Sequence, residues 1–352
     1  MSTRFGSERL LSGQPIGATT LTISRIALAV LAVGFGIAAA IGRVPSLEVQ
    51  LVVYLIGMVA LNLPHGGYEH FANLRRRAQS FRLWYLAYYL GLIGGFIALF
   101  VVAPVAALAI AFGVTVAKGG GGDLHVMAAT TGTDHLRSRL QRLLAAVARG
   151  GAVIAVPIVA WPETFYAFSA IMVDMFQPGA IAVLPSIELT RWLVGVGYGA
   201  VVLTHLGWGF YNRTGSGAFL ADAAETGLLV TYFTLVPVVV AIGLYFPLWY
   251  SLRQVGREAT VETEPPTGGR DLLAADDPSN VALRSWAVLV FGALATGAVA
   301  AILWVAAPYP LGGTSLLYGA VAFWTVFICI IALPHVVVGA IFDRRRGIWH
   351  VP

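Results

Sequence analysis

The chain has 352 residues, of which 58% are hydrophobic and only 11% are charged, and its mean hydropathy is +0.80. Soluble domains carry roughly 25% charged residues, so this composition excludes an ordinary water-soluble enzyme. At about 20 apolar residues per crossing, the length predicts an all-α, polytopic integral membrane protein with about ten transmembrane helices.

The predicted elements begin after a polar segment, residues 1–21. The stretch from Trp161 to Pro185 is ambiguous, because charges and three prolines interrupt it. It is expected to be a tenth helix, a re-entrant piece or an outer loop. The other long apolar runs lie at 22–42, 49–65, 83–103, 104–117, 143–161, 192–211, 226–250, 285–307 and 314–341.

The arginines orient these runs. Lys118 is the only lysine, so the net charge of +5 comes from arginines, which lie mostly at predicted helix ends and argue against nucleic-acid binding. Arginine clusters mark the cytoplasmic side, and they occur after the second run and in the C-terminal segment 343–352. With the ambiguous stretch counted as a helix, ten crossings place both termini in the cytoplasm. We therefore predict a multi-pass cell-membrane protein with a single transmembrane domain over residues 22–342.

Two interruptions have distinct compositions. Acidic residues, prolines and glycines crowd the segment 253–283, which predicts a mobile polar loop that begins at Arg253. Four glycines, residues 119–122, lack the Lys-Ser/Thr of a phosphate loop, and we interpret them as a flexible bend. The single cysteine, Cys329, excludes intramolecular disulfides and Cys-rich zinc sites.

Histidines within apolar runs are candidate ligands, although a histidine bonded to a helix carbonyl is the commoner case. On an unbroken helix His65 and Glu69 share a face, whereas His70 points about 140° away from His65. Glu69 is therefore expected as a ligand or as the carboxylate that orients a metal-bound imidazole. In the ten-helix topology His65, His125 and His335 lie at one cytoplasmic depth, which suits iron, zinc or copper. No pair has the spacing of a strong metal motif.

Aromatic residues gather near the second, third and seventh runs. Interfacial belts explain many such residues. The alternative is a channel for a long apolar ligand that enters from the bilayer. Its expected lining is Tyr68, Trp84, Tyr88, Phe246 and Trp249.

Several motifs, taken in order along the chain, resemble those of the Brp/Blh family. That family consists of archaeal and bacterial membrane proteins that cleave β-carotene at its central double bond to give retinal. The most specific segment is His65-Gly66-Gly67-Tyr68-Glu69-His70, which is similar to the family's His-Gly-Ala-x-Asp-His. The others are His125, Arg149-Gly150 through Pro157, Tyr245-Phe246-Pro247-Leu248-Trp249 and Leu333-Pro334-His335.

The resemblance implies a non-haem Fe(II) centre that activates O2, with His65 and His125 as two of four histidine ligands. The other two ligands come from a Trp-His-Ser-x-Arg-His pattern, in which this chain has Tyr250 and Gln254 instead. A four-histidine site is therefore excluded. A reduced site of His65, His125 and His335, with Glu69, is the expected alternative.

Three functions remain open from the sequence. The first is a membrane-embedded dioxygenase acting on a carotenoid. The second is a non-catalytic relative that binds a carotenoid or retinal, or that partners a homologous subunit or a rhodopsin. The third and weakest is a small-solute transporter. The chain is not expected to carry covalent retinal itself, because a Schiff base needs a lysine inside a helix and Lys118 is expected at a helix end.

Overall fold

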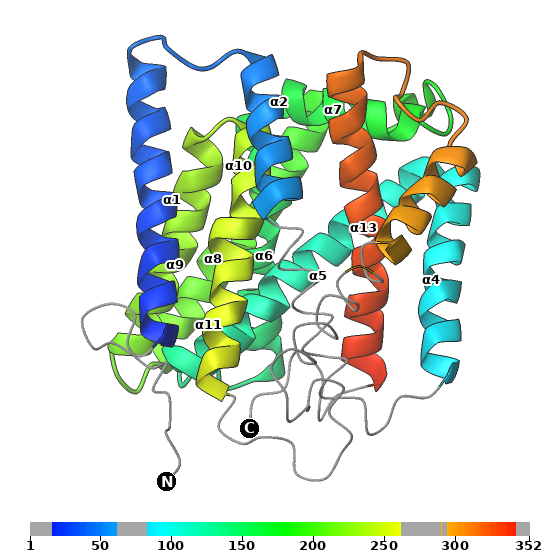
Figure 1. Ribbon diagram of the computed structural model, residues 1–352. Helices are drawn as coiled ribbons and strands as arrows, with labels where there is room; N and C mark the ends of the chain where they lie inside the picture. Colours follow the sequence, from blue (N-terminus) through cyan, green and yellow to red (C-terminus); the bar gives the residue numbers. More distant parts are fainter. Residues whose placement is uncertain (1–15, 62–82, 262–289, 291–293, 343–352) are drawn as a thin grey trace, which may run out of the picture.

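The computed structural model describes residues 16–61, 83–261, 290 and 294–342, and every element in these ranges is helical. The all-α prediction is therefore confirmed for this part of the chain (Figure 1). The elements are α1 (Ile16–Ala40), α2 (Leu47–Leu55), η1 (Ile56–Leu61), α4 (Leu83–Val102), α5 (Pro104–Thr130), α6 (Arg139–Ala160), α7 (Pro162–Asp174), η2 (Ala180–Val183), α8 (Ile187–Asn212), α9 (Gly217–Leu235), α10 (Val238–Tyr245), η3 (Phe246–Ser251), α11 (Leu252–Val261), a helix over Leu294–Ala306 and α13 (Leu316–Phe342).

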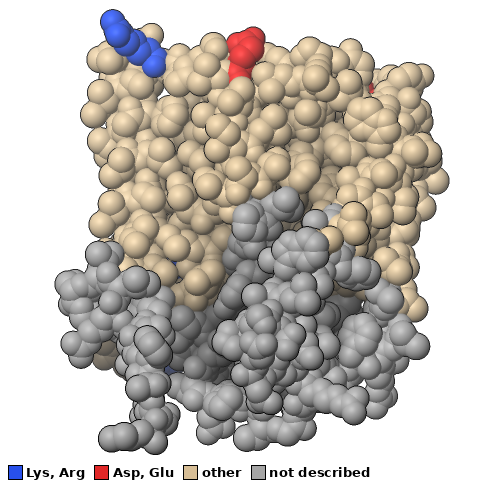
Figure 2. Space-filling view, viewed as in Figure 1, with Lys and Arg blue, Asp and Glu red and all other residues tan. Residues whose placement is uncertain are grey.

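Six helical stretches are long and apolar enough to cross a membrane. The described part of the surface in Figure 2 fits this arrangement, because the prominent charged side chains on that face lie at its upper end and most of the rest is uncharged. The described helices therefore suit a polytopic membrane protein. The six stretches are Gly17–Ala40, Pro104–Thr130, Arg139–Ala160, Ile187–Asn212, Val238–Arg257 and Leu316–Pro334, and shorter apolar helices cover Leu47–Leu61, Ala87–Val102 and Leu294–Ala306.

Three predicted boundaries are corrected. Helix α1 begins at Ile16, so residues 16–21 are helical and do not belong to the polar N-terminal segment. The predicted run 104–117 continues as helix to Thr130. The predicted run 226–250 is broken, because α9 ends at Leu235 and Val236 is extended before Pro237. Proline disfavours the helical conformation in the residue that precedes it, which accounts for the break.

The ambiguous stretch between residues 161 and 185 forms α7 and the 3-10 turn η2. The 13 residues of α7 span only about 20 Å, which is shorter than the roughly 30 Å hydrocarbon core of a bilayer. The Asp174 carboxylate accepts a hydrogen bond from the backbone N–H of Gly179, which closes the turn after the helix. This stretch therefore lies at one end of the bundle, at the top of Figure 1, and is not a full crossing.

The four glycines at 119–122 do not form the flexible bend predicted from the sequence, since α5 runs through them without interruption. A Cβ atom on Gly120 would lie 1.9 Å from the carbonyl oxygen of Ala146 on α6, and one on Gly150 would lie 2.1 Å from that of Val116. The glycines therefore let the two helix backbones approach closely, as small residues do at membrane helix interfaces. The helix persists because an unpaired backbone is costly in a bilayer.

Helix α5 connects two hydrophobic cores. Its first half packs with α4, α7, the 294–306 helix and α13 around Phe100 and Phe327. A second core, around Tyr232 and Trp249, joins α1, α6, α9, α10 and η3. In Figure 1 α5 runs obliquely between the two groups of helices, and it contacts both α6 and α11. Its second half therefore has one face toward α6 and another toward η3 and α11.

Candidate functional site

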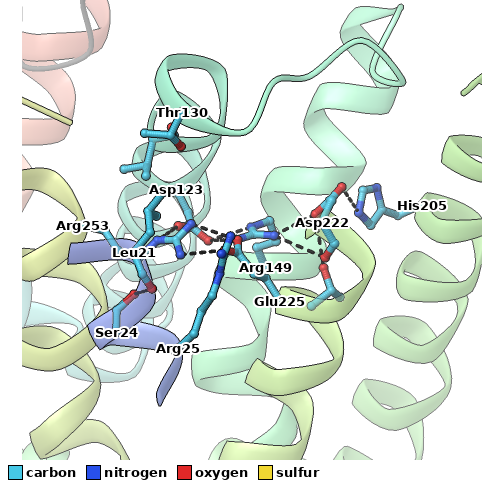
Figure 3. Close-up of polar contacts among 12 residues, drawn as sticks. Leu21, Ser24, Arg25, Asp123, Thr130, Arg149, His205, Asp222, Glu225 and Arg253 are labelled. Carbon is cyan, nitrogen blue, oxygen red and sulfur yellow. Dashed lines mark hydrogen bonds and ion pairs between the residues drawn. The ribbon is translucent and has the colours of Figure 1, made fainter. Parts of the chain in front are cut away.

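An ionic network lies buried where α5, α6, α9 and α11 meet (Figure 3). At its centre is Arg149 of α6, only 1% exposed. Its Nε atom lies 2.6 Å from Oδ2 of Asp123, and its Nη1 atom lies 2.7 Å from Oδ1 of Asp222. Nη2 also donates to Glu225. One guanidinium thus joins three carboxylates from α5 and α9.

Two further arginines complete the network. Arg253 of α11 donates to both carboxylate oxygens of Glu225, at 2.8 and 2.9 Å, and its Nε lies 2.8 Å from Asp123. Arg25 of α1 contacts Glu225 at 2.6 Å. Three arginines therefore face three carboxylates, so the formal charges cancel, as burial in a low-dielectric interior requires.

Two histidines extend the network at Asp222. The Nε2 atom of His135 lies 2.9 Å from Oδ2 of Asp222, and Nε2 of His205 lies 3.0 Å from the same oxygen. Both imidazoles are buried. These histidines hold the α5–α6 connection and α8 against α9, so they act as structural partners of a carboxylate.

The position of Arg253 corrects the predicted polar linker. This residue was expected to begin a mobile loop, but it lies in α11 and is 1% exposed, and Gln254 and Arg257 are buried beside it. The positive charge of Arg253 is neutralised by Glu225. Residues 262–283 of the predicted loop lie outside the described residues.

Of the predicted metal ligands, His125 is the one whose side chain is among the described residues. It is partly buried on α5, and its Nδ1 lies 2.7 Å from the carbonyl oxygen of Gly121. Because a carbonyl can only accept, Nδ1 carries the proton and Nε2 keeps its lone pair. Metal-binding histidines commonly use this arrangement. His125 is about 200° around the helix from Asp123, so it faces away from the ionic network.

The two replaced ligand positions lie on the segment that faces His125. Tyr250 lies in the last turn of η3 and is 5% exposed, and Gln254 follows four residues later in α11, at 3% exposed. The Nζ atom of Lys118 lies 5.4 Å from the centre of the Tyr250 ring. Arg257, one turn further along, is close enough to His125 for a direct electrostatic interaction. The structure therefore brings the α5 and α11 positions together.

Other candidate ligands cannot be placed. His65, Glu69 and Tyr68 lie outside the described residues, as do the side chains of Trp84 and His335. Within the described part of the chain, no group of three His, Cys, Asp or Glu side chains could hold a metal ion. The tautomer of His125 suits a ligand of an iron centre, because its Nε2 carries no proton. The described residues alone do not supply the others.

The aromatic residues divide between the two cores. Phe246 lies 6.3 Å from Tyr250, measured between ring centres, in an edge-on arrangement. Trp249 is fully buried, and the Arg253 guanidinium lies 4.2 Å from its ring centre. Tyr88 lies on α4, whose buried residues belong to the other core, and its side chain is exposed. Phe246 and Trp249 thus adjoin the candidate site, and Tyr88 is not in their cluster.

The sequence analysis missed the ionic network. Arg149 lies within the predicted apolar run 143–161, but no carboxylate partner was predicted for it. Asp222 and Glu225 precede the run that was taken to begin at residue 226, although their spacing of three residues puts them on one helix face. A buried arginine needs a carboxylate partner, so the pair Asp222 and Glu225 near a neighbouring apolar run was the signal in the sequence.

The chain is similar to known proteins over nearly its whole length. The sequence profile of the β-carotene 15,15'-dioxygenase family matches residues 56–343. A probable β-carotene 15,15'-dioxygenase Brp from Halobacterium salinarum is 56% identical over 342 residues, which cover 96% of this chain and 95% of that protein. A probable β-carotene 15,15'-dioxygenase Blh from the same organism is 32% identical, covering 96% and 100%. No solved structure matches the chain.

Proposed function

Because the chain belongs to the β-carotene 15,15'-dioxygenase family, we propose that it is an oxidoreductase that adds O2 across the central double bond of β-carotene and releases retinal. The observation that carries this proposal is the 56% identity over 96% of the chain. Such coverage includes α5, α11 and α13, which hold the candidate residues. The described surface is rich in exposed apolar side chains, which suits a substrate that reaches the protein through lipid.

The metal that we assign to this activity is Fe(II), held by His65, His125 and His335, with Glu69 as a fourth ligand or as an orienting carboxylate. When bound, iron would supply the activation of O2. The Gly121 carbonyl supports this assignment for His125, because it fixes the tautomer that leaves Nε2 as the donor. Tyr250 and Gln254 cannot provide the two further imidazoles of a four-histidine site.

The ionic network positions both helices that border this site. Asp123 lies two residues before His125, and Arg253 lies between Tyr250 and Gln254. The pairing of Asp123 with Arg253 therefore fixes α5 relative to α11 at the level of the site. The Tyr250 ring lies against Lys118 and supplies aromatic surface beside the site.

We also propose the membrane arrangement that the arginines favour. Both termini face the cytoplasm in this arrangement. The stretch 161–185 does not cross, but the predicted run 226–250 is divided into α9 and the α10–η3–α11 segment, so the proposed count of ten crossings is kept. The transmembrane domain, predicted over residues 22–342, begins with α1, and residues 262–283 form a polar loop. The basic segment 343–352 then lies on the cytoplasmic side.

The proposal is tested on the purified full chain by measuring metal content by mass spectrometry and retinal by chromatography after incubation with β-carotene. We expect bound iron and retinal production. His125→Ala should lower the iron content and the retinal yield by at least about tenfold, which is the effect expected when a metal ligand or its hydrogen-bonded partner is lost. The matched control is His350→Ala, near the end of the sequence, which should keep both.

One control and two outcomes decide the test. Loss of folding in His125→Ala is checked by its unfolding temperature, and in that case His125→Gln is measured instead. If the wild type holds no iron and leaves β-carotene unchanged, the dioxygenase is rejected. If it then retains carotenoid or retinal through purification, the chain is the non-catalytic binding relative.

A further inference from the structure

The only lysine of the chain lies inside a membrane helix. Lys118 was expected at a helix end beside glycines, but it lies near the middle of α5, which continues through those glycines to Thr130. Seven residues separate Lys118 from His125, so the two side chains share a helix face about 10 Å apart along the axis. The argument that excluded covalent retinal therefore no longer holds.

The surroundings of Lys118 hold no described counter-charge. Its Nζ lies over the Tyr250 ring, and Cys329 of α13 is near enough for an electrostatic interaction. Within the described ranges, no ion pair joins Lys118 to a carboxylate, whereas Arg149 contacts three. An ionisable group inside a membrane is costly, and one without a partner carboxylate indicates a functional role.

A lysine amine differs from a guanidinium in its chemistry. It loses its proton far more readily, and the neutral amine is a nucleophile that forms Schiff bases with carbonyl compounds. The expected product of this enzyme is an apolar aldehyde. The aldehyde would be formed beside His125 of α5 and Tyr250 of η3. Both are candidate-site residues close to Lys118.

We propose that Lys118 is a covalent capture site for the aldehyde product, which it binds as a Schiff base. This inference rests on the proposed function. The Nζ lone pair attacks the aldehyde carbon, and a C=N bond replaces the C=O bond. The carbonyl oxygen leaves as water with the two amine protons, so no electrons are exchanged with an oxidant or a reductant. Hydrolysis reverses the step and releases the aldehyde.

The captured aldehyde would remain beside the site until water or a partner reaches the imine. Tyr250 and Phe246 supply aromatic surface for the conjugated chain next to the amine. Capture would keep a reactive aldehyde from diffusing into the bilayer. It also gives a reason for the tyrosine at position 250, because its ring holds the Lys118 amine in the apolar interior by a cation–π contact.

The experiment adds all-trans-retinal to the purified full chain, traps any imine with cyanoborohydride and locates it by intact mass and peptide mapping. Because the chain has one lysine, only Lys118 and the N-terminal amine can react. We expect one retinyl group per chain on the Lys118 peptide. Acidifying the untrapped complex should shift its absorption to longer wavelength, as the imine becomes protonated.

Two variants control for non-specific reaction. Lys118→Arg keeps the charge but removes the nucleophile, and it should show no adduct in the helix. Ala117→Lys combined with Lys118→Arg moves the lysine to an exposed neighbouring position on α5. Its labelling should be at least about tenfold slower, because the amine is no longer oriented beside Tyr250.

The two proposals fail separately. Absence of an adduct in the wild type, or equal labelling of the relocated lysine, would overturn the capture site whatever the enzyme does with β-carotene. Conversely, if β-carotene is not cleaved but added retinal still labels Lys118 selectively, the dioxygenase proposal fails and an aldehyde-binding site remains.

Discussion

The two faces of α5 treat charge in opposite ways. Toward α6, Asp123 meets Arg149 and Arg253, and glycines bring the backbones together. Toward η3 and α13, Lys118 meets an aromatic ring and His125 is held by a backbone carbonyl. Both faces are polar within a helix of membrane-spanning length. The first face neutralises its charges internally, and the second presents groups that can react or bind.

This difference separates structural from functional polarity. In a bilayer an ionisable side chain is costly on either face, so polarity alone does not identify a site. The network satisfies its charges and links α1, α5, α6, α9 and α11. The opposite face leaves its amine without a described carboxylate, which is unfavourable unless a ligand or a reaction uses it. The comparison predicts that the same substitution has opposite effects on the two faces.

The largest effect is expected for Arg149→Met. Removing this guanidinium leaves Asp123, Asp222 and Glu225 buried with fewer cations, and breaking such a buried pair costs about 3–5 kcal/mol. We expect low yield and a strongly lowered unfolding temperature in detergent, measured by the loss of monodisperse protein on heating. Arg43→Met, on the exposed connection after α1, is the matched control and should behave like the wild type. An unchanged unfolding temperature for Arg149→Met would contradict the structural role.

Lys118→Met should act in the opposite direction. Methionine fills a similar volume and carries no charge, so the variant loses only a cation–π contact and is relieved of a charge in an apolar setting. We expect unfolding stability equal to the wild type or slightly higher, because the cost of the buried charge is removed. The measurement is the same heating assay. A loss as large as that of Arg149→Met would show that Lys118 belongs to the structural framework, and the contrast between the faces would be wrong.

The sequence predicted the class of the fold better than its details. The low charge and long apolar runs correctly indicated helices, because every backbone group in a bilayer must be hydrogen-bonded within its own helix. The bend at residues 119–122 was wrong because local glycine propensity ignores the packing of α6 against that segment. Arg253 was assigned to a loop because its acidic partner, Glu225, lies 28 residues away and on another helix.

The candidate site was predictable in part. The motif around His125 and the replaced positions 250 and 254 were found from the order of motifs, and the structure places these segments against one another. The role of Lys118 was not predictable. Its neighbour Tyr250 is far along the sequence, and the contact appears only when α5 stays helical past residue 118. Both the helical course of α5 and the contact between Lys118 and Tyr250 depend on tertiary packing.

The smallest effect is expected outside the bundle, where the same kinds of groups meet in water. Asp134, in the α5–α6 connection, accepts a hydrogen bond of 2.8 Å from Thr214, and this bond holds the pKa of its carboxyl below the ordinary value of 3.8. A carboxyl whose pKa is lowered by folding stabilises the folded state above its unfolded pKa and loses this contribution as the pH falls through the folded value. Thr214→Val should therefore be slightly less stable than the wild type at pH 6, and the difference should be smaller at pH 3, below the ordinary pKa of 3.8.

Thr234→Val is the matched control for that change, since Thr234 is exposed and bonds only a helix carbonyl, so its effect should not vary with pH. The unfolding temperatures of both variants are compared with the wild type at the two pH values, and subtraction cancels the titration of the buried network. Because Asp134 is almost fully solvated, the expected difference is small beside that of Arg149→Met. A large, pH-dependent loss of stability in Thr214→Val would mean that exposed contacts at the helix connections stabilise the fold as much as the buried network does. Burial would then not explain why the α6-facing side of α5 is structural.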